Sequence, residues 1–347
     1  MKVSDYIVRY LHQKGITTVF GYSGGAITHL MDSFLRCPDI KFIQTYHEQC
    51  AAIAAEGYSC FSGTLGVALA TSGPGATNMI TGIADAFFDS IPALYITGQV
   101  NTYEYKGTKP IRQQGFQETD IVSIVRPITK YATMINDPTQ VLYELEKAWS
   151  IAMTGRYGPV LLDIPMNVQR AEIDVSNLDT FEMLPTSEKS LKYINGFSRE
   201  KLAALIRISE RPLLLLGNGI KLAGAVGAAC RLAQRFKLPV VTSLLGKGAF
   251  PEDDQLSVGM IGSYGNRCAN LAIANSDLVI AMGTRLDTRQ TGTNLPTFVR
   301  GGRIVRIDID EAEIKYSRLV NVDAVLGDVQ PFIEELFSMP WSLEREK

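Results

Sequence analysis

Short apolar runs alternate with segments of helical periodicity through the first half of the chain. The runs have the length of β-strands and lie at residues 17–21, 41–46, 65–73 and 92–99. The helical segments begin near Asp5, Ala26, Glu48 and Ala76. Strands that alternate with helices in this way form βαβ units, in which neighbouring strands are parallel. The pattern therefore predicts an α/β domain over residues 1–170.

A polar, irregular stretch then interrupts the alternation, and we place a linker at residues 171–195. A second α/β series follows over residues 196–347. Its apolar runs lie beside glycine or proline at 211–219, 238–246, 277–285 and 302–310. Continuous apolar runs of this length are typical of parallel strands buried on both faces. The predicted fold class is α/β, with two doubly wound parallel-sheet domains.

The length and composition of the chain agree with a two-domain globular protein. The chain has 347 residues, of which 46% are hydrophobic and 20% charged. A net charge of −2 without a basic block argues against nucleic acid as a partner. No apolar run reaches membrane-span length, and the N-terminus does not resemble a signal peptide, so we expect no membrane association.

The cysteines and histidines indicate the redox state of the thiols and the chance of a metal site. The five cysteines have no CxxC spacing, as expected for reduced thiols, which favours a cytoplasmic location. The three histidines form no metal-ligand pair, so we predict no metal site built by this chain.

Glu48 is the first candidate functional residue. It stands where an apolar strand meets a helix rich in alanine, and open α/β sheets hold their ligands at such junctions. The alternative is that Glu48 only complements the positive end of the helix dipole.

Two glycine loops also lie between a strand and a helix. Gly73 and Gly75 flank Pro74 in "ATSGPGATN", and Gly24 lies in "GYSGGA". Such loops can bring main-chain N–H groups against a ligand. The first loop matches neither GxxxxGK[ST] nor GxGxxG, so a tight structural turn remains the alternative.

Charged residues follow two strands of the second domain. Arg285, Asp287 and Arg289 come directly after one of them. Arginines at this position can grip phosphate or carboxylate, although a solvated charge cluster is the alternative. Asp308 and Asp310 end another strand, where an acid can accept from ribose hydroxyls.

Taken together, these motifs resemble the thiamine-diphosphate-dependent enzymes, and within them the acetolactate (acetohydroxyacid) synthase branch. The matching segments are "GYSGGA", "HEQCAAIAAEGYS", "TSGPGATNMITGIADAFFDSIPALYITGQV", "GFQETDIV", "GPVLLDIP", "GKGAFPEDD", "DLVIAMGTRLDTRQTG" and "RIDID". The resemblance implies that residues 1–170 form the pyrimidine-binding domain and residues 196–347 the flavin-type middle domain.

The resemblance also implies roles for individual residues around thiamine diphosphate. Glu48 matches the glutamate that hydrogen-bonds N1′ of the aminopyrimidine. Pro74 and Asn78 match residues lining the pyrimidine pocket. Gly24, Phe116 and Gln117 match positions close to the reacting centre.

In the acetolactate branch the middle domain holds FAD, which the resemblance implies as a second cofactor. The matching positions are Arg156, Gly217, Gly262, Gly283, Arg285, Asp287, Asp308 and Asp328. Arg289 matches an arginine for the carboxylate of the acceptor 2-oxo acid. Met166 stands where the branch has a lysine near the substrate, and a thioether cannot steer an anion. This difference favours another donor or acceptor acid.

Family members hold Mg²⁺ and the diphosphate on a third domain with a Gly-Asp-Gly motif, which does not occur among the 347 residues. We therefore expect the C-terminal diphosphate-binding domain to be absent and the isolated chain to be inactive. A homodimer, a higher oligomer or another chain would have to complete the site. The alanine-faced helix from Glu48 to Tyr58 is our candidate for part of that pairing surface.

The favoured hypothesis is part of an enzyme that decarboxylates and ligates small 2-oxo acids. One alternative is a non-catalytic flavin- or nucleotide-binding module, although such a module needs none of Glu48, Phe116 and Gln117. Another is a related thiamine-diphosphate decarboxylase or lyase with a different substrate. An NAD-type dehydrogenase is disfavoured because GxGxxG with a following acid is missing.

Overall fold

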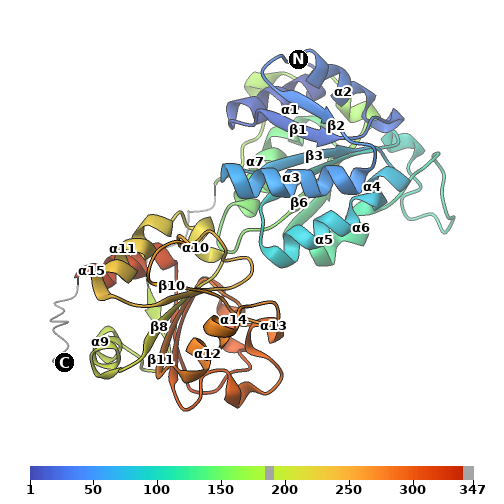
Figure 1. The fold of residues 1–347 in the computed structure, drawn as a ribbon. Coiled ribbons are helices and arrows are strands. Elements are labelled where there is room, and N and C mark those ends of the chain that lie inside the picture. Colours follow the sequence, from blue (N-terminus) through green and yellow to red (C-terminus); the bar gives the residue numbers. More distant parts are fainter. Residues whose placement is uncertain (184–190, 339–347) are drawn as a thin grey trace. The chain divides into compact units, whose positions relative to one another are not determined.

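The chain divides into two compact units. The structure is a computed structural model that describes residues 1–183 and 191–338. The units are Met1–Thr186 and Ser187–Lys347, so the boundary falls inside the predicted linker 171–195. Part of that linker, like the last nine residues of the predicted second domain, lies outside the described residues. Each unit is an open α/β structure (Figure 1).

The first unit is built on a six-stranded parallel sheet with the order β2-β1-β3-β4-β6-β5. The strands are β1 Thr18–Gly21, β2 Lys41–Gln44, β3 Gly66–Ala70, β4 Ala93–Gln99, β5 Tyr131–Met134 and β6 Val160–Pro165. The chain moves from β1 to β2 on one side and continues at β3 on the other. The strand order therefore reverses between β1 and β3, which is where open α/β sheets bind ligands.

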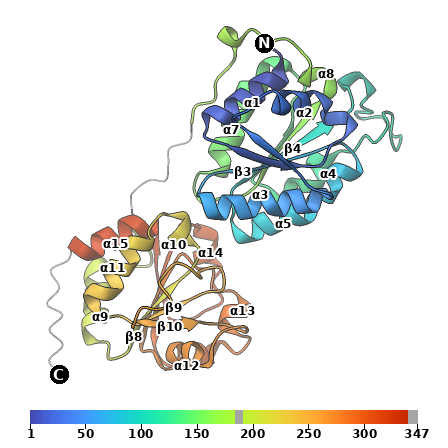
Figure 2. The same ribbon diagram turned by 45° about the horizontal axis from the view of Figure 1, so that its top comes forward.

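Helices cover both faces of this sheet. They are α1 Val3–Gln13, α2 Thr28–Leu35, α3 Glu48–Ser62, α4 Pro74–Asn78, α5 Ile80–Asp89, α6 Ile121–Val125, α7 Val141–Ala152 and α8 Met166–Gln169. Val67 and Leu69 of β3 join the core with α1, α2 and α7, whereas Ala68 and Ala70 join the core with α3 and α5. Figure 2 shows these two helical layers on opposite sides of the strands. The alternation follows from the two-residue period of a strand.

The small residues of α3 pack inside the first unit. Ala51, Ala52 and Ala55 have no solvent-exposed surface. A Cβ atom on Gly66 would lie 1.9 Å from the Ala55 carbonyl oxygen, and one on Gly82 would lie 2.5 Å from Ala52 Cβ. These residues thus allow α3 to approach β3 and α5 closely. Ala51, Ala52 and Ala55 are thus covered by the protein's own core, while Ile53 and Gly57 of the same helix are exposed, so the pairing surface expected on this helix stays a prediction.

The second unit has a seven-stranded sheet with the order β10-β9-β8-β11-β12-β13-β7. The strands are β7 Lys192–Tyr193, β8 Pro212–Leu216, β9 Val240–Thr242, β10 Ser257–Met260, β11 Leu278–Met282, β12 Arg303–Asp308 and β13 Val322–Leu326. The sheet is parallel except for the short edge strand β7, which pairs antiparallel with β13. Its order reverses between β8 and β11, so the expected ligand edge lies there.

Helices again lie on both faces of the second sheet. They are α9 Arg199–Ile208, α10 Gly219–Leu222, α11 Val226–Phe236, α12 Arg267–Asn275, α13 Thr288–Thr291, α14 Glu311–Lys315 and α15 Val329–Ser338. Helices α9, α11 and α15 share one core, and α12 belongs to the other. The fold class predicted from the sequence, two doubly wound parallel-sheet domains, is confirmed. Across the described ranges, no helix has both the length and the apolar character needed to span a membrane.

Candidate functional site

Three loops of the first unit meet where its strand order reverses. Thr71, directly after β3, lies at their centre. A Cβ atom on Gly24, in the loop after β1, would lie 2.4 Å from Thr71 Cβ. The Thr71 Oγ1 atom accepts a hydrogen bond of 3.1 Å from the Ala26 N–H in the same loop. The loop after β1 can therefore contact the loop after β3 only because residue 24 has no side chain.

Glu48 enters this junction from the start of α3. His47 caps the helix, because its Nδ1 accepts from the Gln49 N–H, and this fixes where Glu48 begins the first turn. The Glu48 side chain is only 6% exposed. Asn78 Nδ2 donates to Glu48 Oε2 over 2.9 Å. The structure thus brings together two residues predicted from separate motifs.

The second oxygen of this carboxyl group faces the glycine loop. A Cβ atom on Gly75 would lie 3.1 Å from Glu48 Oε1 and 2.6 Å from Thr71 Cγ2. Pro74 begins α4, where the missing N–H costs nothing. Gly75 therefore keeps space open beside Oε1, the carboxylate oxygen that Asn78 does not hold.

The segment that carries Phe116 and Gln117 lies against the same loop. Gly73 has φ 62°, and a Cβ atom there would lie 2.8 Å from both Cβ and the carbonyl oxygen of Gln117. Gln117 itself has φ 61°, an uncommon conformation for a residue with a side chain. The Phe116 side chain is 84% exposed. Gln117 thus lies against the glycine loop, and its neighbour Phe116 is largely exposed to solvent.

Glu118 anchors this segment, a role that the sequence did not reveal. Its carboxylate accepts from the backbone N–H groups of Lys106, Gln114 and Gly115 over 2.8, 2.8 and 3.1 Å. Burial alone would raise the pKa of Glu118, but these three donors outweigh it and hold the pKa below its usual value. The three residues that donate to Glu118 are near it in sequence, but no periodic pattern in the sequence predicts these hydrogen bonds.

A second buried acid ties the sheet to the same segment. Asp163 in β6 accepts from Thr97 Oγ1 over 2.7 Å and from Gln99 Nε2 over 2.9 Å. Gln99 Nε2 also donates to the Thr119 carbonyl oxygen over 2.7 Å. Complete burial raises the pKa of Asp163 to about 7, although both side-chain hydrogen bonds oppose the shift. The sequence signal was an aspartate inside the apolar run "VLLDIP".

Met166 follows β6 directly and begins α8. It therefore lies at the carboxyl ends of the strands, the edge that also carries Glu48 and the glycine loop. The Met166 side chain is partly buried. Its thioether therefore stands at this edge where the resemblance would place a lysine ammonium group.

In the second unit, glycines meet where β8 and β11 end. A Cβ atom on Gly217 would lie 2.1 Å from the Gly283 carbonyl oxygen, and Gly283 has φ 59°. The Gly217 and Gly219 N–H groups donate to the carbonyl oxygens of Met282 and Gly283, each over 3.0 Å. Gly217 and Gly283 are thus brought together, and the chain's own backbone uses much of the room that they provide.

The predicted acids of this unit already have partners. Asp308 accepts from Arg306 Nη2 over 2.7 Å, and the Arg306 side chain is fully buried. Burial raises the pKa of Asp308, although Arg306 opposes the shift. Asp310 caps α14 by accepting from the Ala312 N–H, and Asp328 accepts from the Gln330 N–H. A buried arginine within a strand was not anticipated from the sequence.

The arginines after β11 lie on a short turn. Arg285 Nη2 is 3.6 Å from Asp287 Oδ2, and Asp287 caps α13 by accepting from the N–H groups of Arg289 and Gln290. Arg289 lies over the Tyr264 ring, 6.0 Å from its centroid. A Cβ atom on Gly262 would lie 2.7 Å from the Arg289 carbonyl oxygen. Gly262 and Arg289 are therefore neighbours.

Arg156 belongs to the first unit, unlike the other positions predicted for FAD. It lies between α7 and β6, and its Nε donates to Ser90 Oγ over 2.8 Å. The second unit also contains a polar cleft of about 480 Å³ beside β9 and β10, lined in part by Lys247, Glu252 and Tyr264. Arg285 and Asp308 do not line this cleft.

Two family models match the chain. Residues 1–124 match "Thiamine pyrophosphate enzyme, N-terminal TPP binding domain", and residues 199–336 match "Thiamine pyrophosphate enzyme, central domain". Together they include the whole set of loops around Glu48 and the glycine edge of the second unit.

Curated relatives match nearly the whole length of this chain. The chain is 39% identical over 345 residues to a "Probable acetolactate synthase large subunit" of Methanocaldococcus jannaschii, which covers 99% of this chain and 57% of the relative. It is 38% identical over 351 residues to an acetolactate synthase of Arthrospira platensis, covering 98% of this chain and 58% of the relative. The chain thus spans little more than half the length of these relatives.

A solved structure shares the fold. The X-ray structure of a "putative thiamin diphosphate-dependent enzyme" from Mycobacterium smegmatis superposes with a TM-score of 0.79 at 22% identity. The match covers 97% of this chain and 62% of that one. At this identity the likeness concerns the fold alone.

Proposed function

Because the chain belongs to the thiamine pyrophosphate enzyme family, with its N-terminal and central domains, we propose that it binds the aminopyrimidine part of thiamine diphosphate. The observation that carries this proposal is the buried Glu48, with one oxygen held by Asn78 and the other facing Gly75. Gly24 and Gly75 let their loops close around Thr71 beside Glu48, because Cβ atoms on them would lie 2.4 and 2.6 Å from Thr71 side-chain atoms. The reaction we propose is acetolactate-synthase-like, namely decarboxylation of one 2-oxo acid and ligation to another.

The residues of this chain have separate tasks in that reaction. Bound thiamine diphosphate supplies a positive ring that accepts the electron pair released as CO₂ leaves a 2-oxo acid. Glu48 would hold the pyrimidine nitrogen N1′ of the bound cofactor by a hydrogen bond from the carboxyl oxygen that Asn78 does not contact. Asn78 fixes the orientation of the Glu48 carboxyl group, and Phe116 and Gln117 border the space for substrate.

The diphosphate and its Mg²⁺ need other ligands. Mg²⁺ prefers near-octahedral oxygen ligands that include phosphate, and Gly-Asp-Gly does not occur among the 347 residues. We propose that a domain with this motif completes the site, whether in a second copy, in another chain or in further sequence of the same polypeptide.

The test is turnover by an assembled enzyme. The chain is combined with the C-terminal domain of an acetolactate synthase relative, and CO₂ release and acetolactate formation from pyruvate are measured. We expect Glu48→Gln to lower kcat by roughly 10²–10⁴, the usual scale for a positioned acid–base group. Asp39→Asn, an exposed acid before β2 at the edge of the sheet opposite these loops, is the control and should leave the rate unchanged. An active assembly in which Glu48→Gln keeps the full rate would contradict the proposal.

Met166 favours a second candidate, a decarboxylase or lyase of the same family with another 2-oxo acid as substrate. Its thioether begins α8 at the edge that carries Glu48, and it offers no charge to a carboxylate. In the same assembly, Met166→Lys should shift kcat/KM toward pyruvate over larger or less polar 2-oxo acids. Unchanged ratios would remove Met166 from substrate choice.

We also propose that the second unit binds FAD at the carboxyl ends of β8 and β11. The glycines at this edge and the partly exposed Arg285 support it. The acids support it less, because Asp308 is paired with Arg306 and Asp287 caps a helix. Uptake of FAD by the purified chain, followed by absorbance after gel filtration, tests the proposal. No uptake at tens of micromolar FAD would overturn it.

A further inference from the structure

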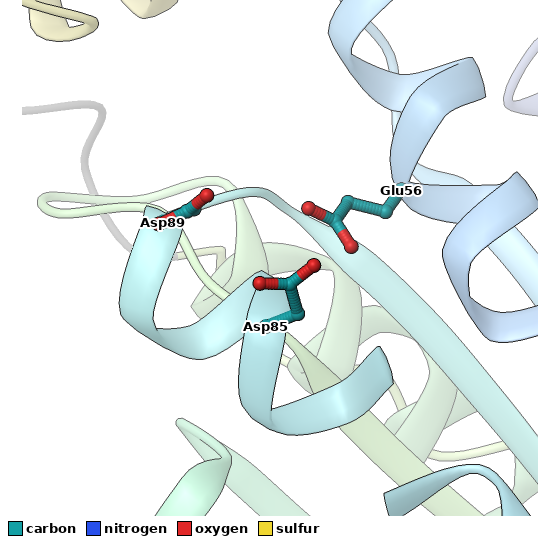
Figure 3. A group of neighbouring side chains, drawn as sticks. All are labelled: Glu56, Asp85 and Asp89. Carbon is teal, nitrogen blue, oxygen red and sulfur yellow. The ribbon is translucent and has the colours of Figure 1, made fainter. Parts of the chain in front are cut away.

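Three carboxylates gather on the first unit, away from the loops around Glu48. Glu56 comes from α3, and Asp85 and Asp89 come from α5, one turn apart. One oxygen atom from each lies within 4.8 Å of the other two. Figure 3 shows the three side chains directed toward one another from the two helices. Glu56 lies eight positions after Glu48, roughly 12 Å along the helix axis.

Glu56 is the unusual member of this group. Its side chain is only 8% exposed, and its Oε2 atom is buried without a hydrogen-bond partner. A buried carboxylate oxygen without a partner is costly, and carboxylates this close to one another repel. A cation bound between the three carboxylates would offset this repulsion and supply a partner for Oε2.

We propose that Glu56, Asp85 and Asp89 bind a divalent metal ion of the hard type, such as Mn²⁺, Mg²⁺ or Ca²⁺. Carboxylate oxygens are the ligands these ions prefer. Asp85 is exposed and Asp89 partly exposed, which leaves an open side for entry and for water ligands. The ion would join α3 to α5 and so stabilise the helix whose first residue is Glu48.

Two other ionisable residues, Arg156 and Tyr95, lie near the three carboxylates. Arg156 donates to Ser90, the residue after Asp89, so its guanidinium adds positive charge at the α5 end of the group. Tyr95 lies beneath with its hydroxyl donating to the Gly82 carbonyl oxygen, and burial raises the Tyr95 pKa so far that it stays neutral. Burial, with Asp85 and Asp89, raises the pKa of Glu56 to about 7, which makes a proton the competitor of the metal ion.

Metal binding by the purified 347-residue chain tests the proposal. The protein is stripped with a chelator, and Mn²⁺ is added without thiamine diphosphate at pH 8, where protons compete least. We expect one Mn²⁺ per chain by electron paramagnetic resonance and a higher midpoint of thermal unfolding. Glu56→Gln and the exposed Asp85→Asn should each weaken Mn²⁺ binding at least tenfold and abolish the shift in midpoint.

Glu48→Gln is the matched control, because it removes a buried carboxylate from the same helix and leaves the three acids in place. It should bind Mn²⁺ like the unaltered chain. Asp85→Asn covers the case in which Glu56→Gln does not fold. The proposal is overturned if the unaltered chain binds no Mn²⁺, or if the folded variants bind it equally well. It is also overturned if Glu56→Gln raises the midpoint of thermal unfolding by the same amount with and without Mn²⁺. The three carboxylates would then be held together by a shared proton, and no metal ion would be needed to explain them.

Discussion

At the scale of single residues, the site depends on the space around Thr71. Its side chain contacts the positions where Cβ atoms of Gly24 and Gly75 would lie, and it accepts a hydrogen bond from Ala26. Thr71 therefore sets how closely two glycine loops approach each other and Glu48. The resemblance identified the glycines, but not the reason for them, because Thr71 meets Gly24 only after the chain has folded.

This arrangement predicts a pair of compensating substitutions. Gly75→Ala places a Cβ atom 2.6 Å from Thr71 Cγ2, so we expect it to lower the unfolding free energy by about 1–3 kcal/mol. Adding Thr71→Ser removes that methyl group and should restore part of the loss. Urea unfolding of the single and double variants measures both. Gly57→Ala, at an open position of α3, should stabilise instead, and equal losses at Gly57 and Gly75 would contradict the explanation.

Asp163 makes stability depend on pH in a defined direction. Its pKa is about 7 in the folded protein and roughly 3.9 when unfolded, so the folded state binds the extra proton between these values. The stabilisation is complete below the unfolded pKa and is lost as pH rises through about 7, with a slope of up to about 1.4 kcal/mol per pH unit. Asp163→Asn resembles the protonated form and should flatten the slope. Urea unfolding at pH 5 and pH 7 would show this, and parallel slopes for both proteins would refute it.

At the scale of elements, continuous apolar runs predicted the central strands well. The runs at 65–73, 92–99, 211–219 and 277–285 contain β3, β4, β8 and β11, because strands buried on both faces have few polar residues. The edge strands β5, β7 and β10, and β13 beside β7, are short or partly exposed, and they were not predicted. Strand β6 was also missed, although all of its residues are buried. The alanine face of α3 was recognised from the sequence, but its packing against β3 and α5 was not. A stripe of small residues predicts close packing and does not specify which surface it packs against.

Asp287 looks like part of a binding site in the sequence, but in the structure it caps the start of helix α13. Its carboxylate accepts from the backbone N–H groups of Arg289 and Gln290 at the start of α13. Asp287→Ala should therefore cost about 1 kcal/mol of unfolding free energy, whereas Asp287→Asn, which keeps an acceptor, should cost little. Thermal unfolding distinguishes the two variants. Equal losses would show that the charge next to Arg285, and not the cap, is what matters.

At the scale of the whole molecule, the order and spacing of motifs identified the family, because eight separate segments had to agree. Contacts between distant segments, such as that of Asp163 with Gln99, follow from how the sheets fold and leave no periodic signal in the sequence. The same whole-chain view suggests what the 347 residues can bind. In the function proposed above, the buried Glu48 holds the pyrimidine of thiamine diphosphate, but the 347 residues contain no Gly-Asp-Gly motif for the charged end.

We therefore predict weak thiamine diphosphate binding by the 347-residue chain alone, with a Kd no tighter than about 1 mM. A single hydrogen-bonding carboxyl group and apolar contacts must first offset the loss of translational and rotational freedom. Adding Mg²⁺ and a domain with the Gly-Asp-Gly motif should tighten binding at least tenfold, because most of the attraction for a diphosphate comes from the metal ion and its oxygen ligands. Isothermal titration calorimetry with and without that domain makes the comparison, with Glu48→Gln as the variant that should weaken the completed site. Micromolar binding by the chain alone would mean that residues other than those around Glu48 hold the diphosphate.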